Sequence, residues 1–290
     1  MSSMPAKKIT VDELAKNLIA DLMEELESDR LVLPSLPEVA LRVRDTIDDP
    51  NANSGQISKV ISTDAGLTAR LIQVANTPLV RGNRKIDSID IAITRMGNTM
   101  VKNVVSSLIV QQMFQPTTEL SDKKLRKFWE HSTEVAAISH ALAGMASLKP
   151  DLALLAGLVH DIGALPVIKA AEDIPELLED EAVLDEVIAQ LHRPIGTAML
   201  TKWNFEEDII AVADSHEQLD RVSGEAIDYV DIVMVANLQS YLSTDHHLAG
   251  QDWSLVPAFA KLGLSSDVSI VDIDDNGESI NEVKAALRGD

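Results

Sequence analysis

Apolar residues recur at helical spacing along this chain, and this pattern constrains its fold more than any other feature. Near the N-terminus four leucines lie four residues apart: Leu14, Leu18, Leu22 and Leu26. That spacing places them on one face of a helix over residues 11–29, and Thr10 with Glu13 has the spacing of a capping box. Only nine of the 290 residues are aromatic, so the core must be aliphatic, which favours helices over sheets. We predict an all-α protein.

The helical patterns change in length near residue 115. Before it they are short and end at Gly, Pro or Asn, at residues 39–48, 54–64, 66–75, 86–95 and 98–112. After it they are longer, at residues 121–147, 151–168, 181–202 with an interruption at Pro194, 206–216 and 227–242. We predict four parts: an N-terminal helix extension (1–30), a small helical bundle (31–118), a larger helical subdomain (119–249) and a C-terminal extension (250–290). The last part combines an apolar run at 268–273 with a terminal helix.

The charge balance and the lack of cysteine exclude several classes of function. The 25 basic and 46 acidic residues give a net charge of −21, and the resulting negative field repels nucleic-acid phosphates. The N-terminus has no apolar run of a secretory signal, and no uninterrupted apolar stretch approaches the roughly 20 residues of a membrane span. Without cysteine, any metal must be bound by His, Asp or Glu. We expect a cytoplasmic protein with no nucleic-acid or membrane partner.

Three charged segments stand out locally: basic residues at 81–85 and 123–127, and an acidic stretch at 172–186. The basic segments could form an anion or partner site, and the alternative is that they are solvated charges that balance neighbouring acids. The acidic stretch is typical of a solvated helix face or loop. None of these segments defines a site on its own.

All seven histidines lie after residue 130, so any histidine chemistry belongs to the second half of the chain. His131 shares a helical stripe with Val135 and Leu142, which predicts that it faces inward. His140 lies nine residues further along, on the opposite side of that helix, where we expect it to be exposed to solvent without a role. A buried histidine alone is more often a hydrogen-bonded core residue than a ligand, so His131 needs partners before it indicates a site.

A His160-Asp161 pair interrupts the apolar segment AGLVHDIG. Burying both side chains is costly unless they pair or coordinate a cation. Imidazole nitrogen and carboxylate oxygen are suitable ligands for a divalent ion such as Zn, Fe, Mn or Mg. With His131 they would give three ligands from two neighbouring helices. The alternative, that His160 and Asp161 bond only each other and nearby backbone, stays open on spacing alone.

Six segments of the chain resemble the HDOD family, the HD-related output domains of bacterial signalling: LPSLPEVALRVRDTIDDP, ISKVISTDAGLTARLIQVANTP, IDSIDIAITRMG, FWEHSTEVAAISHALA, GLVHDIG and LHRPIGTAMLTKWNF. The resemblance covers residues 31–242. It implies a small N-terminal helical bundle packed on an HD-like helical subdomain. In the HD superfamily of metal-dependent phosphohydrolases a His, a His-Asp pair and a later Asp bind the metal. By resemblance, the metal ligands here are His131, His160 and Asp161.

The chain departs from the HD pattern at the last ligand. The closing Asp of HD enzymes falls on Asn237, a neutral and weaker ligand, so the metal would lose one compensating charge. Asp231 lies about 120° away on the same helix, so it should point elsewhere rather than replace the missing acid.

His192 and His216 match positions where the related HD-GYP phosphodiesterases place histidines for a second metal. The match is incomplete, because Ser215 stands in place of the first member of a His-His pair and no Gly-Tyr-Pro segment follows. Each histidine also has a local alternative. His192 could bond a carbonyl freed by Pro194, and His216 could interact with a helix dipole.

The sequence supports three functional hypotheses. The leading one is a bacterial signalling or regulatory HDOD protein that acts through contacts with a regulatory protein, with a cleft that is vestigial or binds a metal or ligand as an input. The alternative is a metal-dependent phosphohydrolase or phosphodiesterase, in which a divalent metal (Fe, Mn, Zn or Mg) activates water and His192 or His216 assists proton transfer or holds phosphate. The third is a helical scaffold whose polar cluster only fixes the packing. Asn237 and the incomplete second ligand set favour the first.

Overall fold

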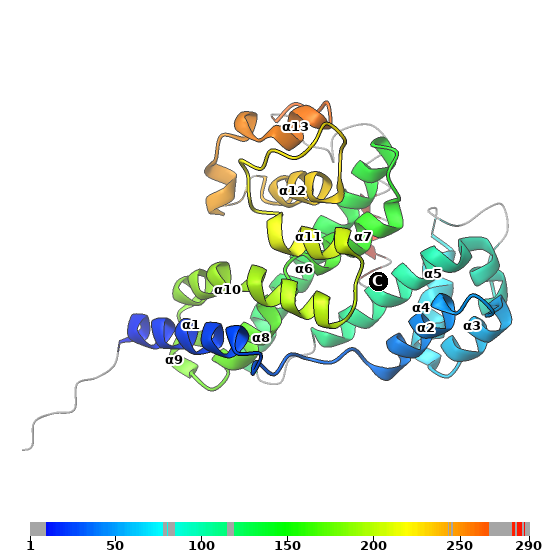
Figure 1. The fold of residues 1–290 in the computed structure, drawn as a ribbon, viewed down its shortest axis with the longest axis horizontal. Helices are drawn as coiled ribbons and strands as arrows, with labels where there is room; N and C mark the ends of the chain where they lie inside the picture. The colour runs from blue at the N-terminus through cyan, green and yellow to red at the C-terminus, as the bar shows by residue number, and fades with distance from the viewer. Residues whose placement is uncertain are drawn as a thin grey trace, which may run out of the picture.

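The computed structural model describes residues 10–77, 80, 85–114, 119–242, 244, 246–266, 280, 281, 283–285 and 287. Within these residues every regular element is a helix and no strand occurs, so the all-α prediction is confirmed (Figure 1). The predicted boundary loop at 115–118, the basic residues 81–84 and the apolar run at 268–273 lie outside the described residues.

A small bundle consists of α2 (Glu38–Asp48), α3 (Ser54–Ile61), α4 (Ala65–Ala75) and α5 (Ile89–Met113). The last three begin at side chains that accept an amide hydrogen bond in the first turn: Asn53, Asp64 and Ser88. The helices predicted at 86–95 and 98–112 are one element with a kink at Gly97, whose φ of 75° and ψ of 163° interrupt the helical path. Glycine adopts this positive φ without steric cost, which explains its presence at the kink.

A larger group consists, within the described residues, of α6 (Glu119–Met145), α7 (Pro150–Val159), α8 (Ala164–Ala171), α9 (Pro175–Glu179), α10 (Glu181–Lys202), α11 (Glu207–Ser215) and α12 (Tyr229–Ser240). The single helix predicted over residues 151–168 is wrong, because the backbone turns between α7 and α8. In this turn the amides of Ile162 and Ala164 bond to carbonyls three residues earlier instead of four. His160 and Asp161 therefore lie at a helix end rather than inside a helix.

The predicted interruption of α10 at Pro194 is also wrong, because the helix continues through the proline. Proline removes one helical hydrogen bond and strains the preceding turn. Leu191 and Ile195 on either side of it are fully buried, so core packing holds both halves of the helix in line.

The first helix, α1 (Val11–Glu27), begins at the predicted capping box, in which Thr10 and Glu13 each accept a hydrogen bond from the other's amide. It packs against α9 and α10. In Figure 1 it lies at the opposite end of the molecule from the small bundle that directly follows it in sequence. The N-terminal extension is therefore part of the larger group in space.

Arg44 of α2 connects the small bundle to the larger group. Its guanidinium donates hydrogen bonds to the carbonyl oxygens of Trp203 and Asn204, just past the end of α10. It also lies 5.3 Å from the centre of the Phe205 ring. A cation beside the last carbonyls of a helix is favoured by the helix dipole, so these contacts fix how the two groups meet.

The chain beyond α12 continues through η1 (His247–Gly250), η2 (Trp253–Leu255) and α13 (Pro257–Lys261), and α13 packs on α12. The described residues between 280 and 287 are helical, in agreement with the predicted terminal helix.

Residues Pro150–Ala171 are long and apolar enough to match a membrane span by composition, but 89% of the matching window is buried inside the molecule. The segment also turns between α7 and α8. It is the central core segment of this helical fold.

Candidate metal centre

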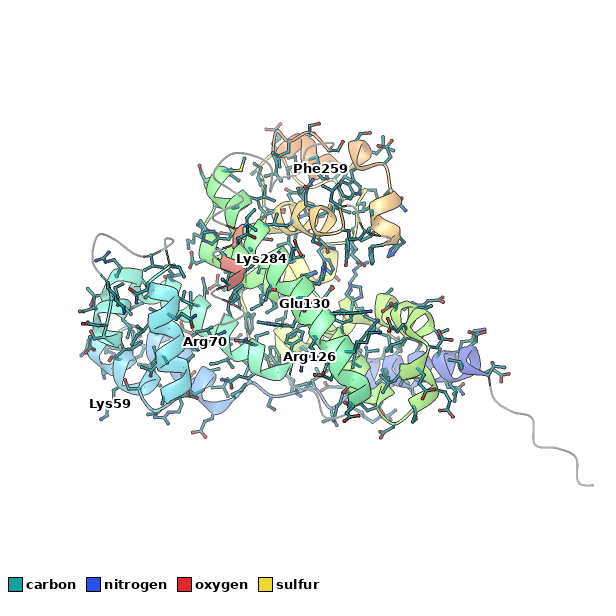
Figure 2. The ribbon with its side chains drawn as sticks, turned by 180° about the vertical axis from the view of Figure 1, so that it is seen from behind. Lys59, Arg70, Arg126, Glu130, Phe259 and Lys284 are labelled. Atoms are coloured by element: carbon teal, nitrogen blue, oxygen red, sulfur yellow. The ribbon has the colours of Figure 1, made fainter. Side chains whose placement is uncertain are left out.

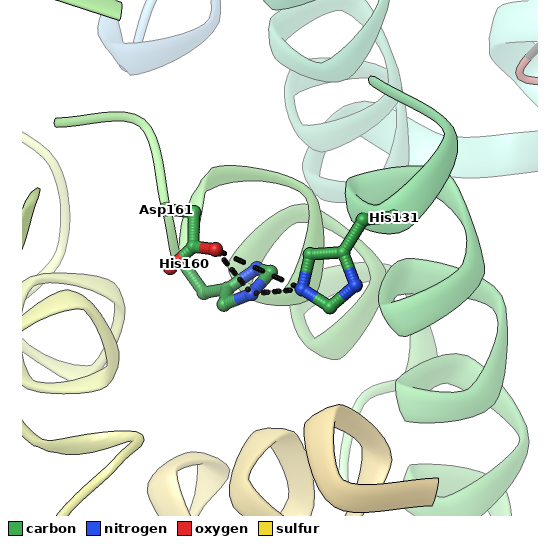
Figure 3. A group of neighbouring side chains, drawn as sticks. All are labelled: His131, His160 and Asp161. Atoms are coloured by element: carbon green, nitrogen blue, oxygen red, sulfur yellow. Dashed lines mark hydrogen bonds and ion pairs between the residues drawn. The ribbon is translucent and has the colours of Figure 1, made fainter. Parts of the chain in front are cut away.

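Five side chains from separate parts of the larger group meet at one point. They are His131 on α6, His160 at the end of α7, Asp161 in the turn that follows, His192 on α10 and His216 at the end of α11. Asp161 is central, because its carboxylate oxygens lie 3.1–3.7 Å from the Nε2 atoms of all four histidines. Figure 3 shows three of these side chains converging. The metal ligands and the catalytic histidines expected from sequence thus form one cluster.

Two glycines allow the backbones to approach closely enough for this cluster. A Cβ atom on Gly157 would lie 2.8 Å from the Cα of Ala136 on α6, and a Cβ atom on Gly163 would lie 1.9 Å from the carbonyl oxygen of His192. Atoms this close would overlap. Gly157 therefore brings α7 against α6, and Gly163 brings the turn that carries Asp161 against α10.

Hydrogen bonds of the Nδ1 atoms fix the orientation and tautomer of each histidine. His160, His192 and His216 each place Nδ1 2.7–3.0 Å from a carbonyl oxygen one turn earlier. A carbonyl only accepts, so Nδ1 carries a proton, and Nε2 keeps a lone pair whenever the ring is neutral. His131 has the same tautomer, because Ser240 Oγ donates its hydrogen to a backbone carbonyl and can only accept from His131 Nδ1, at 3.4 Å. Metal-binding histidines are held in this way.

When all four rings are neutral, the Nε2 atoms and the carboxylate of Asp161 that meet at the centre of the cluster are all acceptors. The Nε2 atoms of His131 and His160 face each other at 3.2 Å. Among the described residues, buried side-chain atoms without a hydrogen-bond partner include Asp161 Oδ1, His192 Nε2 and His216 Nε2. Facing lone pairs repel, and buried acceptors without a donor are costly. A divalent cation fits this donor set, because it would accept lone pairs that lack a hydrogen-bond donor.

Asp161 belongs to two candidate metal triads. One joins it to His131 and His160 and the other to His192 and His216, with the ligand atoms of each triad within 4.8 Å of one another. Oδ2 of Asp161 faces the first pair of histidines, and Oδ1 faces the second pair. The two triads share Asp161, so these residues would be able to hold one ion or two.

Most of the pKa shifts in the cluster favour metal binding, and that of His160 opposes it. Burial, assisted by His160, lowers the pKa of His131 to about 3, and burial lowers the pKa of His216. Burial would also lower the pKa of His160, but Asp161 outweighs it and raises that pKa. Against the effect of burial, His160 and His192 hold the pKa of Asp161 well below its usual range. The carboxylate is ionised, and His131 and His216 are neutral, as metal binding requires.

Tyr241 and Glu217 border the cluster and were not singled out from the sequence. Tyr241 stacks on His131 with ring centres 4.8 Å apart, and its hydroxyl lies 3.2 Å from His131 Nε2. Glu217 Oε2 lies 3.5 Å from His192 Nε2. Tyr241 follows Asn237 by four residues, so helical spacing from the expected closing ligand was the available signal for it.

The position of the closing ligand holds a buried neutral side chain, because Asn237 is 2% exposed and its Oδ1 has no hydrogen-bond partner. Asp231 points away from it, as its helical spacing predicts. Its carboxylate pairs with Arg221 at 3.1 Å and with Lys261, so Asp231 does not replace the missing acid.

His140 is half-buried rather than solvent-exposed, which corrects the expectation from its helical position. Asp151 at the start of α7 lies close enough to act on the His140 ring, and burial lowers the pKa of His140. The basic residues near the start of α6 bond to acids of α10: Lys123 and Lys127 to Glu181, and Lys124 to Asp185. These lysines balance neighbouring acids, which is the simpler of the two interpretations considered for them.

Comparison with known proteins relates this chain to a protein family. A family model of the HDOD domain matches residues 33–219. An uncharacterized protein of Treponema pallidum (strain Nichols) is 24% identical over 246 residues, which cover 80% of this chain and 46% of that protein. The chain therefore spans about half the length of this curated relative.

Solved structures of similar fold come from several bacteria. A Shewanella amazonensis SB2B protein, provisionally assigned as a metal-dependent phosphohydrolase, superposes with a TM-score of 0.83 at 30% identity, covering 94% of this chain and 99% of its own. An HDOD domain protein of unknown function from Geobacter sulfurreducens gives 0.65 at 22% identity, with 95% and 97% covered. A provisionally assigned signal transduction protein from Marinobacter aquaeolei VT8 gives 0.59 at 17% identity, with 98% and 67% covered. The last two show a shared fold alone.

Proposed function

Because this chain belongs to the HDOD family, we propose that it is a bacterial regulatory protein whose cluster of four histidines and Asp161 binds a divalent metal ion. In this proposal it acts through contacts with a signalling or regulatory protein, and metal occupancy is an input to that contact. The family match over residues 33–219 supports the regulatory part. The likeness to the Shewanella structure supports the metal part.

The observation that carries the proposal is the convergence of four histidine Nε2 atoms on the carboxylate of Asp161. Within the described residues, every ion-pair partner of Asp161 is a histidine, and no lysine or arginine pairs with it. A metal ion held by these five side chains would supply the missing positive charge. It would also join α6, α7, α10 and α11, so binding would stabilise their packing.

Two features favour a regulatory site over a catalytic one. Asn237 stands at the closing position, so the ion would receive one negative charge fewer than in the HD pattern. Tyr241 covers His131, and the side chains of His131 and Asp161 are only 15% and 12% exposed. Such a site is accessible to an ion more readily than to a phosphoester.

A second candidate function is metal-dependent hydrolysis of a phosphoester. It is favoured by the structural similarity to the Shewanella protein and by the position of Asp161 between two pairs of histidines. The ion would supply a Lewis acid for attack by water. His216 and His192, the latter close to Glu217, would hold phosphate or move the proton.

Elemental analysis of protein purified without added metal or a polyhistidine tag tests the proposal. We expect near-stoichiometric Fe, Mn or Zn in the wild type, and its loss in a His160→Ala, Asp161→Ala double variant. His140→Ala is the matched control, because His140 lies on the helix of His131 but outside the cluster, and this variant should keep its metal. A wild type that binds no metal even after reconstitution would contradict the proposal.

Turnover separates the two candidate functions. The metal-loaded protein is screened against phosphomonoesters and phosphodiesters, beside the double variant. A regulatory protein shows no turnover above that of the variant. Turnover that disappears in His192→Ala and His216→Ala, with metal retained, would establish the enzyme instead.

A further inference from the structure

The C-terminal extension ends in a short helical segment whose apolar side chains are buried in the body of the molecule. Among its described residues, Ile280, Val283 and Leu287 are each at most 4% exposed. Their spacing of three and four residues places them on one helical face. The segment lies outside residues 33–219 that match the family model.

Polar contacts tie this segment to two helices, α4 of the small bundle and α6 of the larger group. Arg70 of α4 donates hydrogen bonds to the carbonyl oxygen of Leu287 and to the side chain of Gln111 on α5, both at 2.8 Å. Lys284 pairs with Glu134 of α6 at 3.2 Å. Figure 2 shows Arg70 and Lys284 where the small bundle meets α6. We call the area of α4 and α6 around Arg70 and Glu134, which the described residues of 280–287 contact, the junction surface.

The segment resembles a bound peptide in its physical properties. A helix of this length is not stable alone in water, so its helical form depends on the junction surface. Amphipathic helices bind protein grooves through apolar residues at positions i, i+3 and i+7, which is the pattern of Ile280, Val283 and Leu287. Glu134 adds an acid for a basic side chain, and Arg70 adds a donor for the carbonyl end of the helix.

We propose that the junction surface is a docking site for an amphipathic helix of a partner protein, and that residues 280–287 occupy it until the partner displaces them. The partner helix carries apolar residues at i, i+3 and i+7 and Lys or Arg at i+4, where it meets Glu134. An acid at i+4 would be repelled by Glu134 and by the net charge of −21. This site goes beyond the proposed metal site and needs no metal.

The junction surface is connected to both helical groups and to the histidine cluster. Arg70 belongs to the small bundle, whereas Glu134 lies three residues after His131 on α6. Displacement of residues 280–287 would therefore change contacts on the helix that carries a candidate metal ligand.

A labelled peptide of residues 278–290 tests the proposal with full-length chains. A Val283→Asp, Leu287→Asp variant weakens the chain's own segment. We expect this variant to bind the peptide at least about tenfold more tightly than the wild type, whose own segment competes at the high effective concentration of a tether.

Charge reversal supplies a readout that a damaged fold would not produce. A peptide with Lys284→Glu should bind the variant chain at least about tenfold more weakly, because its acid meets Glu134. Adding Glu134→Lys to the variant chain should restore the binding of that peptide. Elemental analysis of the same samples measures the metal content independently, so that failure of the metal proposal can be distinguished from failure of this docking proposal.

Several results would overturn the proposal. One is a variant that keeps its far-UV circular dichroism but binds no peptide, and another is a charge reversal that restores nothing. If the variant loses its fold, hydrogen exchange of the wild type with excess peptide tests the proposal instead. Displacement of the chain's own segment must speed amide exchange within residues 280–287. An unchanged exchange rate contradicts the proposal. A wild-type dimer that exchanges these segments would assign the junction surface to a second copy instead.

Discussion

Asp161 and Asp231 are both buried in the larger helical group, and they differ in what surrounds them. The side chain of Asp231 is 3% exposed and lies between Arg221, at 3.1 Å, and Lys261. The side chain of Asp161 is 12% exposed and is surrounded by histidine Nε2 atoms. Both are removed from water to a similar degree, but within the described residues only Asp231 is paired with lysine or arginine.

The difference shows how a structural acid can be told from a ligand. Burying a carboxylate is costly unless a positive charge accompanies it. For Asp231 the chain supplies that charge when it folds. For Asp161 the charge must be a proton on His160 or an ion from solution. A buried acid therefore indicates a ligand site only where the chain's own cations are missing.

The largest effect that we predict is a loss of stability when Asp231 is replaced. In Asp231→Ala, Lys261 and Arg221 lose a buried partner, so the free energy of unfolding should fall by about 3–5 kcal/mol. The lower end is expected, because Arg221 keeps Asp228 at 2.6 Å. Denaturant unfolding measures the loss, and elemental analysis should show unchanged metal content. A loss below about 1 kcal/mol would place this pair among ordinary surface ion pairs.

The converse change, Asp161→Asn, should affect the metal more than the metal-free fold. We expect the metal affinity to fall at least about 100-fold, or about 2.7 kcal/mol, because the shared carboxylate charge is lost. The unfolding free energy of the metal-free protein should fall less than in Asp231→Ala, because only histidines pair with Asp161. Chelator competition measures the affinity. Equal losses of stability in the metal-free Asp161 and Asp231 variants would contradict the comparison.

Acid should release the metal. A proton and a metal ion compete for Nε2 of His160, and Asp161 raises the pKa of that ring. Affinity should therefore decrease as the pH falls through the raised pKa, starting above about 6.5, the ordinary value for histidine. His131, with a pKa of about 3, contributes little in this range. Chelator competition between about pH 8 and pH 5 checks this, and a flat profile would exclude His160 as a ligand.

The smallest effect concerns the closing position. Asn237→Asp restores the acid of the HD pattern, so we expect metal affinity to rise about tenfold, or about 1.4 kcal/mol. Asn237→Ala is the control, because it removes the amide without adding charge and should give no gain. An Asp at this position that leaves the affinity unchanged would show that residue 237 lies outside the coordination sphere.

Helical periodicity predicted most of the fold, because an amphipathic helix repeats its buried face in the sequence. The break between α7 and α8 could not be predicted in this way. The turn and both helices are buried, so apolar residues continue through it without a change of pattern. Pro194 led to the opposite error. A proline inside a helix predicts an interruption, but core packing on both sides of it keeps α10 continuous.

The candidate site was predictable where a side chain is costly to bury. Asp161 and His160 interrupt an apolar segment, so their burial demands an explanation, and the family resemblance then pointed to His192 and His216. Tyr241 carries no such signal. Its spacing of four residues from Asn237 indicates only that the two share a helical face. The contact of Tyr241 with the cluster depends in addition on α12 packing against α6, a tertiary arrangement that the spacing does not encode.

Gly163 shows how one absent carbon atom lets this cluster form. A methyl group at this position would overlap the carbonyl oxygen of His192, so it would push α10 outward and carry His192 away from Asp161. A change from glycine to alanine would then open the cluster, although every one of its side chains would still be present. The residue that decides whether these side chains can meet is thus one that has no side chain.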